Sequence, residues 1–176
     1  MGKKTKTEHV LIFMKIVAWI AFFSFVVEIG AYLYVYILSF WNPEAAGNFY
    51  HDINLYDLSQ SSVAKYSIVV FFMILTSALK AMVWWLVVKL IRKIKIANPF
   101  TKEVAGKLEK MSYTLFAIWV LGVTGGGFTA WLGELAGTLN DSWNHGTYLF
   151  MAGLVFIISQ IFKRGIEIQS ENELTV

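Results

Sequence analysis

The chain has 176 residues, of which 57% are hydrophobic and only 15% charged, with a net charge of +3 and no cysteine. A soluble domain of this size needs more polar surface, so the composition indicates a membrane protein instead. The lack of cysteine excludes disulfides, lipidated thiols and thiol catalysis.

Four apolar runs are long enough to form membrane-spanning helices, because about 20 residues at 1.5 Å each cross the hydrocarbon of a bilayer. In chain order these runs cover residues 10–38, 66–90, 111–132 and 146–162. The sequence therefore predicts an all-α integral membrane protein in which residues 1–176 form a single four-helix domain.

Outside the apolar runs, the basic residues are concentrated at three places. They precede the first run, connect the second run to the third, and follow the fourth, whereas the other two connections contain Lys65 alone. Because positively charged loops stay in the cytoplasm, both termini and residues 91–110 are expected inside. This arrangement favours a multi-pass protein of a bacterial inner membrane. Anionic headgroups of the lipid bilayer account for the lysines without any direct binding of nucleic acid.

The first outer connection, residues 39–65, is rich in aromatic residues that suit a membrane interface. Two interpretations remain open: a loop lying on the headgroups, or a lid over a ligand site. Two histidine–aspartate sets also face this side, His51 with Asp52 and Asp141 with His145. Two histidines without further converging ligands fall short of a typical metal site, so we expect neither a metal nor a cofactor.

The inner connection contains a short motif that breaks the helix. Its residues are Asn98, Pro99, Phe100 and Thr101. Proline lacks an amide proton and pushes the preceding residue out of helical geometry. Thr101 can cap a new helix, with Glu103 well placed in its first turn. Apolar residues then recur at three- and four-residue spacing, at Val104, Leu108 and Met111. The pattern predicts a short amphipathic elbow at the inner surface before the third span.

Two ionisable residues, Glu28 and Lys80, fall deep within predicted spans. A charge at the centre of a bilayer costs roughly 2.5–3.5 kcal/mol, so each residue requires a partner. With Lys15 and Lys89 both placed at the inner interface, the depths of Glu28 and Lys80 differ by only ~6 Å. The sequence thus predicts a Glu28–Lys80 pair inside the bundle, whose hydrogen bonds can be completed by Ser24, Thr76 and Ser77. Such a pair either fixes helix register or serves a proton or substrate relay.

The third span contains small residues four positions apart, at Gly122, Gly126 and Ala130. Such a seam allows a neighbouring helix to approach closely, either within the chain or in a homo-oligomer. As an alternative, Gly125 to Gly127 can unwind the helix beside the charges, as in the substrate sites of transporters.

Two segments together resemble a known family: "NPFT" and the ending "IFKRGIEIQSENELTV". Beyond Phe162, the matching tail positions are Arg164, Gly165, Glu167, Glu171, Asn172, Leu174, Thr175 and Val176. The family is domain of unknown function family 2975, which comprises small four-span bacterial membrane proteins, and the resemblance covers nearly the whole chain. Its members are often encoded beside a small helix-turn-helix regulator. This resemblance implies a cytosolic transcription factor as a partner.

The predicted cytoplasmic tail, residues 163–176, is acidic and apolar from Gly165 onward. Three interpretations remain open: folding back onto the basic inner surface at Lys102, Lys107 or Lys110, docking on a basic DNA-binding domain, or a disordered end.

Our leading hypothesis is a non-enzymatic regulatory protein whose elbow and tail bind or sequester a cytosolic helix-turn-helix regulator. The alternative is a small transporter or sensor of a membrane-soluble ligand that uses Glu28, Lys80 and residues 122–127. An enzyme is not expected, because no set of nucleophile and base is recognisable.

Overall fold

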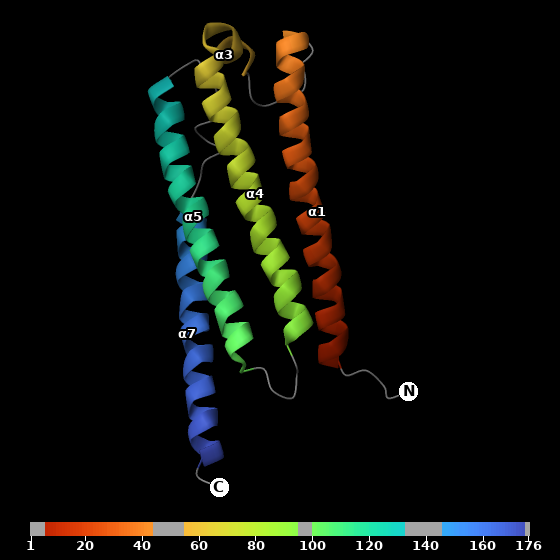
Figure 1. Ribbon diagram of the computed structural model, residues 1–176, viewed down its shortest axis with the longest axis vertical. Helices are drawn as coiled ribbons and strands as arrows, with labels where there is room; N and C mark the ends of the chain where they lie inside the picture. Colours follow the sequence, from red (N-terminus) through yellow and green to blue (C-terminus); the bar gives the residue numbers. More distant parts are fainter. Residues whose placement is uncertain (1–5, 44–54, 95–99, 133–145, 175–176) are drawn as a thin grey trace.

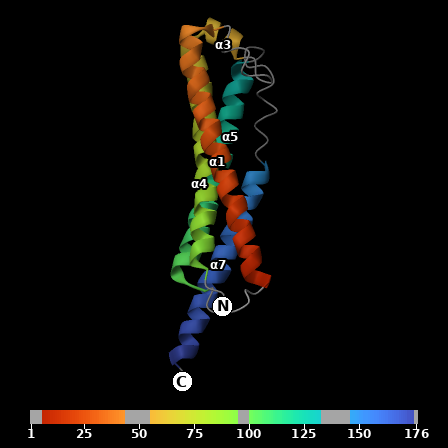
Figure 2. The same ribbon diagram turned by 90° about the vertical axis from the view of Figure 1, so that its right-hand side faces the viewer.

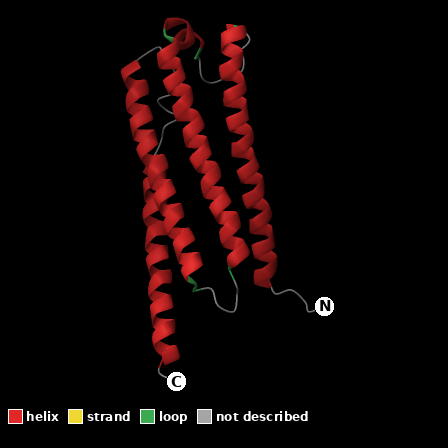
Figure 3. Ribbon diagram, viewed as in Figure 1, coloured by secondary structure: helices red, strands yellow, loops and turns green. Residues whose placement is uncertain are grey.

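The computed structural model describes residues 6–43, 55–94, 100–132 and 146–174. Its elements are α1 (Lys6–Trp41), α3 (Tyr56–Ser61), α4 (Val63–Lys93), α5 (Lys102–Leu132) and α7 (Gly146–Leu174). Four of these helices are long and apolar enough to cross a membrane. The described residues contain no strand (Figure 3). The predicted all-α fold with four candidate spans is confirmed.

The helices run in an up-and-down series in which neighbours in sequence are neighbours in space. α1 packs along α4, α4 along α5, and α5 along α7. Figure 1 shows that both termini lie at one end, where α1 begins, α4 ends, α5 begins and α7 ends. We call this the terminal end. Figure 2 shows that α7 extends farthest in the direction of this end.

The helices are longer than the apolar runs that predict them. α4 and α5 each contain 31 residues, which corresponds to about 46 Å, whereas the hydrocarbon core is about 30 Å thick. The basic residues that follow the "NPFT" motif therefore belong to the first turns of α5, which continues unbroken into the span. Asn98 and Pro99 lie outside the described residues.

The start of α5 follows the expected capping pattern. The Val104 amide donates to Thr101 Oγ1 at 3.3 Å, and the Ala105 amide donates to the Thr101 carbonyl at 3.0 Å. Such a cap satisfies amides that have no acceptor within the helix. The predicted apolar stripe is buried, with exposed fractions of 0% at Val104, 9% at Leu108 and 7% at Met111. The stripe is thus the packing face of α5 at the terminal end.

Two clusters of buried side chains hold the helices together. The first lies at the end away from the termini and contains Leu55, Leu58, Tyr66, Val69, Val70, Met73 and Leu132. The second joins α4, α5 and α7 through Leu86, Met111, Leu115, Ile118 and Ala152. Part of the outer connection is therefore a short helix, α3, packed against α4. Residues 44–54, on which the lid interpretation depends, lie outside the described residues.

Aromatic side chains form part of the contact between α1 and α4. The rings of Trp19 and Trp85 meet edge to face at 5.7 Å, and Phe22 lies 5.5 Å from Trp85. Aromatic pairs of this kind contribute about 0.5–1.5 kcal/mol beyond the area they bury. Most other side chains of α1 are exposed. In a bilayer these apolar side chains face lipid tails.

Substitution of Ala152 by leucine tests the contact between α5 and α7. Ala152 is only 4% exposed, and its carbonyl accepts a hydrogen bond from Ser112 Oγ at 2.9 Å. Ala152→Leu should separate the helices and lower the free energy of unfolding by about 1–3 kcal/mol, because a packed contact cannot absorb the added volume. Thermal unfolding of the purified protein in detergent, followed by circular dichroism, measures the change.

The neighbouring Gly153→Leu is the matched control, since Gly153 is exposed and a Cβ atom added there meets nothing within 4 Å. Equal destabilisation by the two substitutions would contradict the described contact.

Candidate functional site

Phe100 joins the two motifs that lie far apart in the sequence. Its ring centroid is 5.1 Å from that of Phe162, at an angle of 52°. A Cβ atom added at Gly165 would lie 2.7 Å from Phe100 Cδ1, so the ring rests against a position where only glycine fits without a shift. We call this arrangement of Phe100, Phe162 and Gly165 the Phe100 contact. It positions the start of the tail against the residue before the α5 cap.

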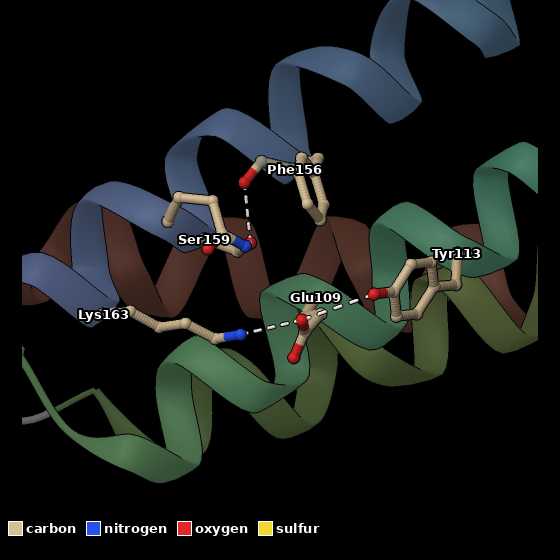
Figure 4. A network of polar contacts seen from close by, with 6 residues as sticks. Glu109, Tyr113, Phe156, Ser159 and Lys163 are labelled. Atoms are coloured by element: carbon tan, nitrogen blue, oxygen red, sulfur yellow. Dashed lines mark hydrogen bonds and ion pairs between the residues drawn. The ribbon is translucent and has the colours of Figure 1, made fainter.

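Ion pairs surround this contact and connect three helices at the terminal end. Lys163 Nζ lies 2.8 Å from Glu109 Oε1 and joins α7 to α5, and Glu109 also accepts from the Tyr113 hydroxyl at 3.4 Å. Figure 4 shows the side chains of Lys163 and Tyr113 directed toward Glu109. Glu103 pairs with Lys107 at 2.6 Å and with Lys93, at the end of α4, at 3.4 Å. Exposed pairs contribute about 0–1 kcal/mol each, so they orient the helices more than they stabilise them.

The predicted tail is a continuation of α7 through Leu174, so the structure does not support the disordered interpretation for the described part. Figure 1 shows α7 projecting past the other helices at the terminal end. Within this projection Arg164 pairs with Glu167 at 2.7 Å. The tail extends away from the bundle, and Lys107, one of its expected acceptors, pairs with Glu103 instead. The side chains exposed on the projection include Arg164, Glu167, Ile168, Ser170, Glu171 and Asn172. Thr175 and Val176 lie outside the described residues.

Glu28 does not pair with Lys80, but it does bond to Ser77, one of the hydroxyl residues predicted to complete its hydrogen bonds. Glu28 Oε1 accepts from the Tyr32 hydroxyl at 2.8 Å and from Ser77 Oγ at 3.1 Å. Lys80 Nζ lies 5.7 Å from the ring centroid of Phe25 on α1 and 5.9 Å from that of Tyr148 on α7. The ion pairs of the described residues do not include Glu28 with Lys80.

Helix geometry explains this difference. α1 and α4 are antiparallel, and the bond from Ser77 to Glu28 places these two residues level with each other. Lys80 follows Ser77 by three residues and so lies about 4.5 Å nearer the terminal end. At that level it meets Phe25, which precedes Glu28 by three residues. The sequence analysis does not identify Tyr32, although its spacing of four from Glu28 places both on one helix face.

The glycine-rich part of α5 is continuous helix, so the unwound alternative does not describe this structure. Gly122 is buried, Gly126 half-buried and Ala130 exposed. The buried face passes instead through Gly122, Gly125, Thr129 and Leu132. A strict four-residue spacing rotates by about 40° per step around a helix with 3.6 residues per turn, and so leaves the contact. The seam predicted at Gly122, Gly126 and Ala130 is thus only partly a packing face within one chain.

The residues considered for a metal site, His51, Asp52, Asp141 and His145, all lie outside the described residues. Elsewhere, in the part of the chain that the structure describes, no group of three or more metal-binding side chains occurs.

A protein-family model with the description "Protein of unknown function (DUF2975)" matches residues 6–176. The chain belongs to the DUF2975 family. The resemblance drawn from "NPFT" and the tail is therefore confirmed. No curated protein and no solved structure matches the chain. In this DUF2975 protein the two motifs that carry the resemblance meet at the Phe100 contact.

A double-mutant cycle tests the Phe100 contact. Glycine to alanine within a helix normally stabilises by about 0.8–1 kcal/mol. In the native chain Gly165→Ala should give no such stabilisation, because the new methyl group displaces the Phe100 ring. In a Phe100→Ala background the gain should return, which corresponds to a coupling energy of about 1 kcal/mol. Unfolding in detergent, measured for all four chains, gives the coupling.

Gly153→Ala serves as the control for this cycle, because its Cβ meets nothing within 4 Å. It should stabilise both backgrounds equally. If Gly165→Ala also stabilises both backgrounds equally, the Phe100 ring does not rest on Gly165.

Proposed function

We propose that this DUF2975 protein is a non-enzymatic regulatory protein of a bacterial inner membrane that binds or sequesters a cytosolic helix-turn-helix regulator. One observation carries the proposal: α7 continues past the other helices as an exposed helix that bears Glu167 and Glu171. About 20 residues are enough to span the hydrocarbon, whereas α7 contains 29. The projecting part of α7 is therefore available to a partner outside the bilayer.

The charge distribution supports a cytoplasmic location for the terminal end. Arg92 and Lys93 lie at the end of α4, Lys107 lies near the start of α5, and Lys163 of α7 pairs with Glu109 of α5. Basic residues flanking spans are retained in the cytoplasm. The projection of α7 then enters the compartment where DNA-binding proteins occur.

The chemistry of the projection suits a basic partner. Ile168 is 46% exposed and lies between the exposed carboxylates of Glu167 and Glu171. DNA-binding domains are basic because they neutralise phosphates, so an acidic helix with an apolar centre can occupy the same surface as DNA. The Phe100 contact holds the helix in one direction, which lowers the entropy cost of binding.

A binding measurement with a helix-turn-helix regulator tests this proposal. The full chain is placed in nanodiscs, and its affinity is measured for a purified helix-turn-helix regulator of the kind often encoded beside members of this family. Glu167→Gln with Glu171→Gln should weaken binding roughly tenfold, since two exposed charges contribute up to about 1 kcal/mol each. DNA carrying the site of the regulator should compete with the membrane protein.

The matched control is Gln60→Lys with Ser61→Lys, which changes the net charge equally. Both residues are exposed on α3, at the end away from the termini. If the regulator does not bind the native chain, or if the control weakens binding as much as the tail variant, the proposal fails.

A transporter or sensor remains the second candidate, on the evidence of Glu28 and Lys80. Glu28 has two hydroxyl donors, and Lys80 contacts rings of both α1 and α7 within the bundle. Such intramembrane charges commonly mark a pathway. Glu28→Gln with Lys80→Met separates the two functions: it should leave regulator binding unchanged and abolish any proton-coupled flux into proteoliposomes.

A further inference from the structure

A groove at the terminal end lies between the first turns of α1 and the last turn of α4. Its volume is about 450 Å³. Two basic residues line it together with four apolar ones: Lys15, Arg92, Leu11, Ile12, Ile91 and Ile94. None of these residues takes part in the Phe100 contact, and the groove is therefore separate from the surface proposed for a protein partner.

The two cations come from different helices, and neither belongs to an ion pair of the described residues. Arg92 is held by Trp19, whose ring centroid lies 5.6 Å from the guanidinium carbon. Stacking on a ring face uses none of the five N–H donors of arginine, which therefore remain for an anion. Lys15 adds three further donors.

Glu8 also lines the groove, and it already interacts within the chain. Together the three ionisable groups leave one net positive charge. A zwitterionic headgroup would leave this charge uncompensated, whereas a headgroup with one net negative charge would balance it.

The apolar lining indicates the source of the anion. α1 and α4 are both candidate spans, so the groove opens beside lipid at the level where an apolar stretch ends. Ile12 is 41% exposed at its edge and the adjacent Phe13 is 64% exposed. A small inorganic anion would leave the apolar lining in contact with water. A phospholipid presents a phosphate to the cations and acyl chains to the isoleucines and Leu11, as basic pockets between spans do in general.

We propose that this groove binds the phosphate headgroup of an anionic phospholipid such as phosphatidylglycerol. The bound lipid bridges α1 and α4 at the terminal end. Because α1 packs mainly on α4, the lipid adds to the connection between these two helices at the terminal end.

Native mass spectrometry of the full-length protein tests the proposal. The protein in mild detergent is titrated with phosphatidylglycerol or with phosphatidylethanolamine that has the same acyl chains. The native chain should retain phosphatidylglycerol preferentially. Lys15→Gln with Arg92→Gln should weaken its binding roughly 30-fold, since a basic residue at the membrane surface contributes about 1 kcal/mol. Inorganic phosphate in excess should not displace the lipid.

The control variant, Lys102→Gln with Lys110→Gln, removes the same charge from exposed positions of α5 outside the groove. It should retain phosphatidylglycerol at nearly native affinity. Ile94→Trp provides a second test that leaves all charges in place, because it fills the groove and should also weaken lipid binding.

Three results would overturn the proposal. These are equal binding of the two lipids by the native chain, equal loss in the groove and control variants, and undiminished binding in Ile94→Trp. The selectivity of the native chain is measured without any substitution, so the test stands even if a variant fails to fold.

Discussion

The interface between α4 and α5 is the contact on which the rest of the molecule depends. α1 packs mainly on α4, and α7 packs mainly on α5, so these two outer helices are connected chiefly through the central pair. Lipid tails are as apolar as the side chains they meet, and burial of apolar surface therefore drives helix association in a bilayer only weakly. Close packing must drive the association instead, and the central pair provides it where Leu86 of α4 and Ile118 of α5 share one buried cluster.

Polar contacts set the register of the outer helices, because apolar packing alone allows helices to slide. Ser77 bonds to Glu28 at 3.1 Å between α4 and α1. Ser112 bonds to the Ala152 carbonyl at 2.9 Å between α5 and α7. Interhelical hydrogen bonds in membranes contribute about 0.6 kcal/mol on average. Their main effect here is on helix register, because each hydrogen bond can form in only one register, whereas an apolar contact can form in several.

The sequence was sufficient to predict the features that depend on neighbouring residues along the chain. It predicted the four spans, the cap at Thr101 and the apolar stripe at Val104, Leu108 and Met111, although it placed this stripe at the membrane surface and not in the packing between helices. It also named Ser77 as a hydrogen-bond partner at this depth, but it wrongly paired Glu28 with Lys80 and missed Tyr32, because depth counting places residues on a level only to within about one turn. The partner is then chosen by the rotation of each helix about its axis. Helix rotation also decides which small residues of α5 are buried, so the predicted glycine seam is only partly a packing face. The contact of Phe100 with Gly165 followed from no local signal, because it depends on how α7 packs on α5.

The terminal end divides into two parts with different surroundings. The proposed lipid groove belongs to α1 and α4 and faces the side of the bundle, whereas the Phe100 contact belongs to the start of α5 and to α7. Lys93 and Glu103 connect the two parts directly, at 3.4 Å. Both side chains are about half exposed, and an exposed pair of this kind contributes at most about 1 kcal/mol. Any influence of bound lipid on the direction of α7 must therefore pass mainly through the packed face between α4 and α5. The rigidity of the packing between α4 and α5, more than the ion pair at its end, therefore determines whether lipid bound in the groove changes the direction of α7.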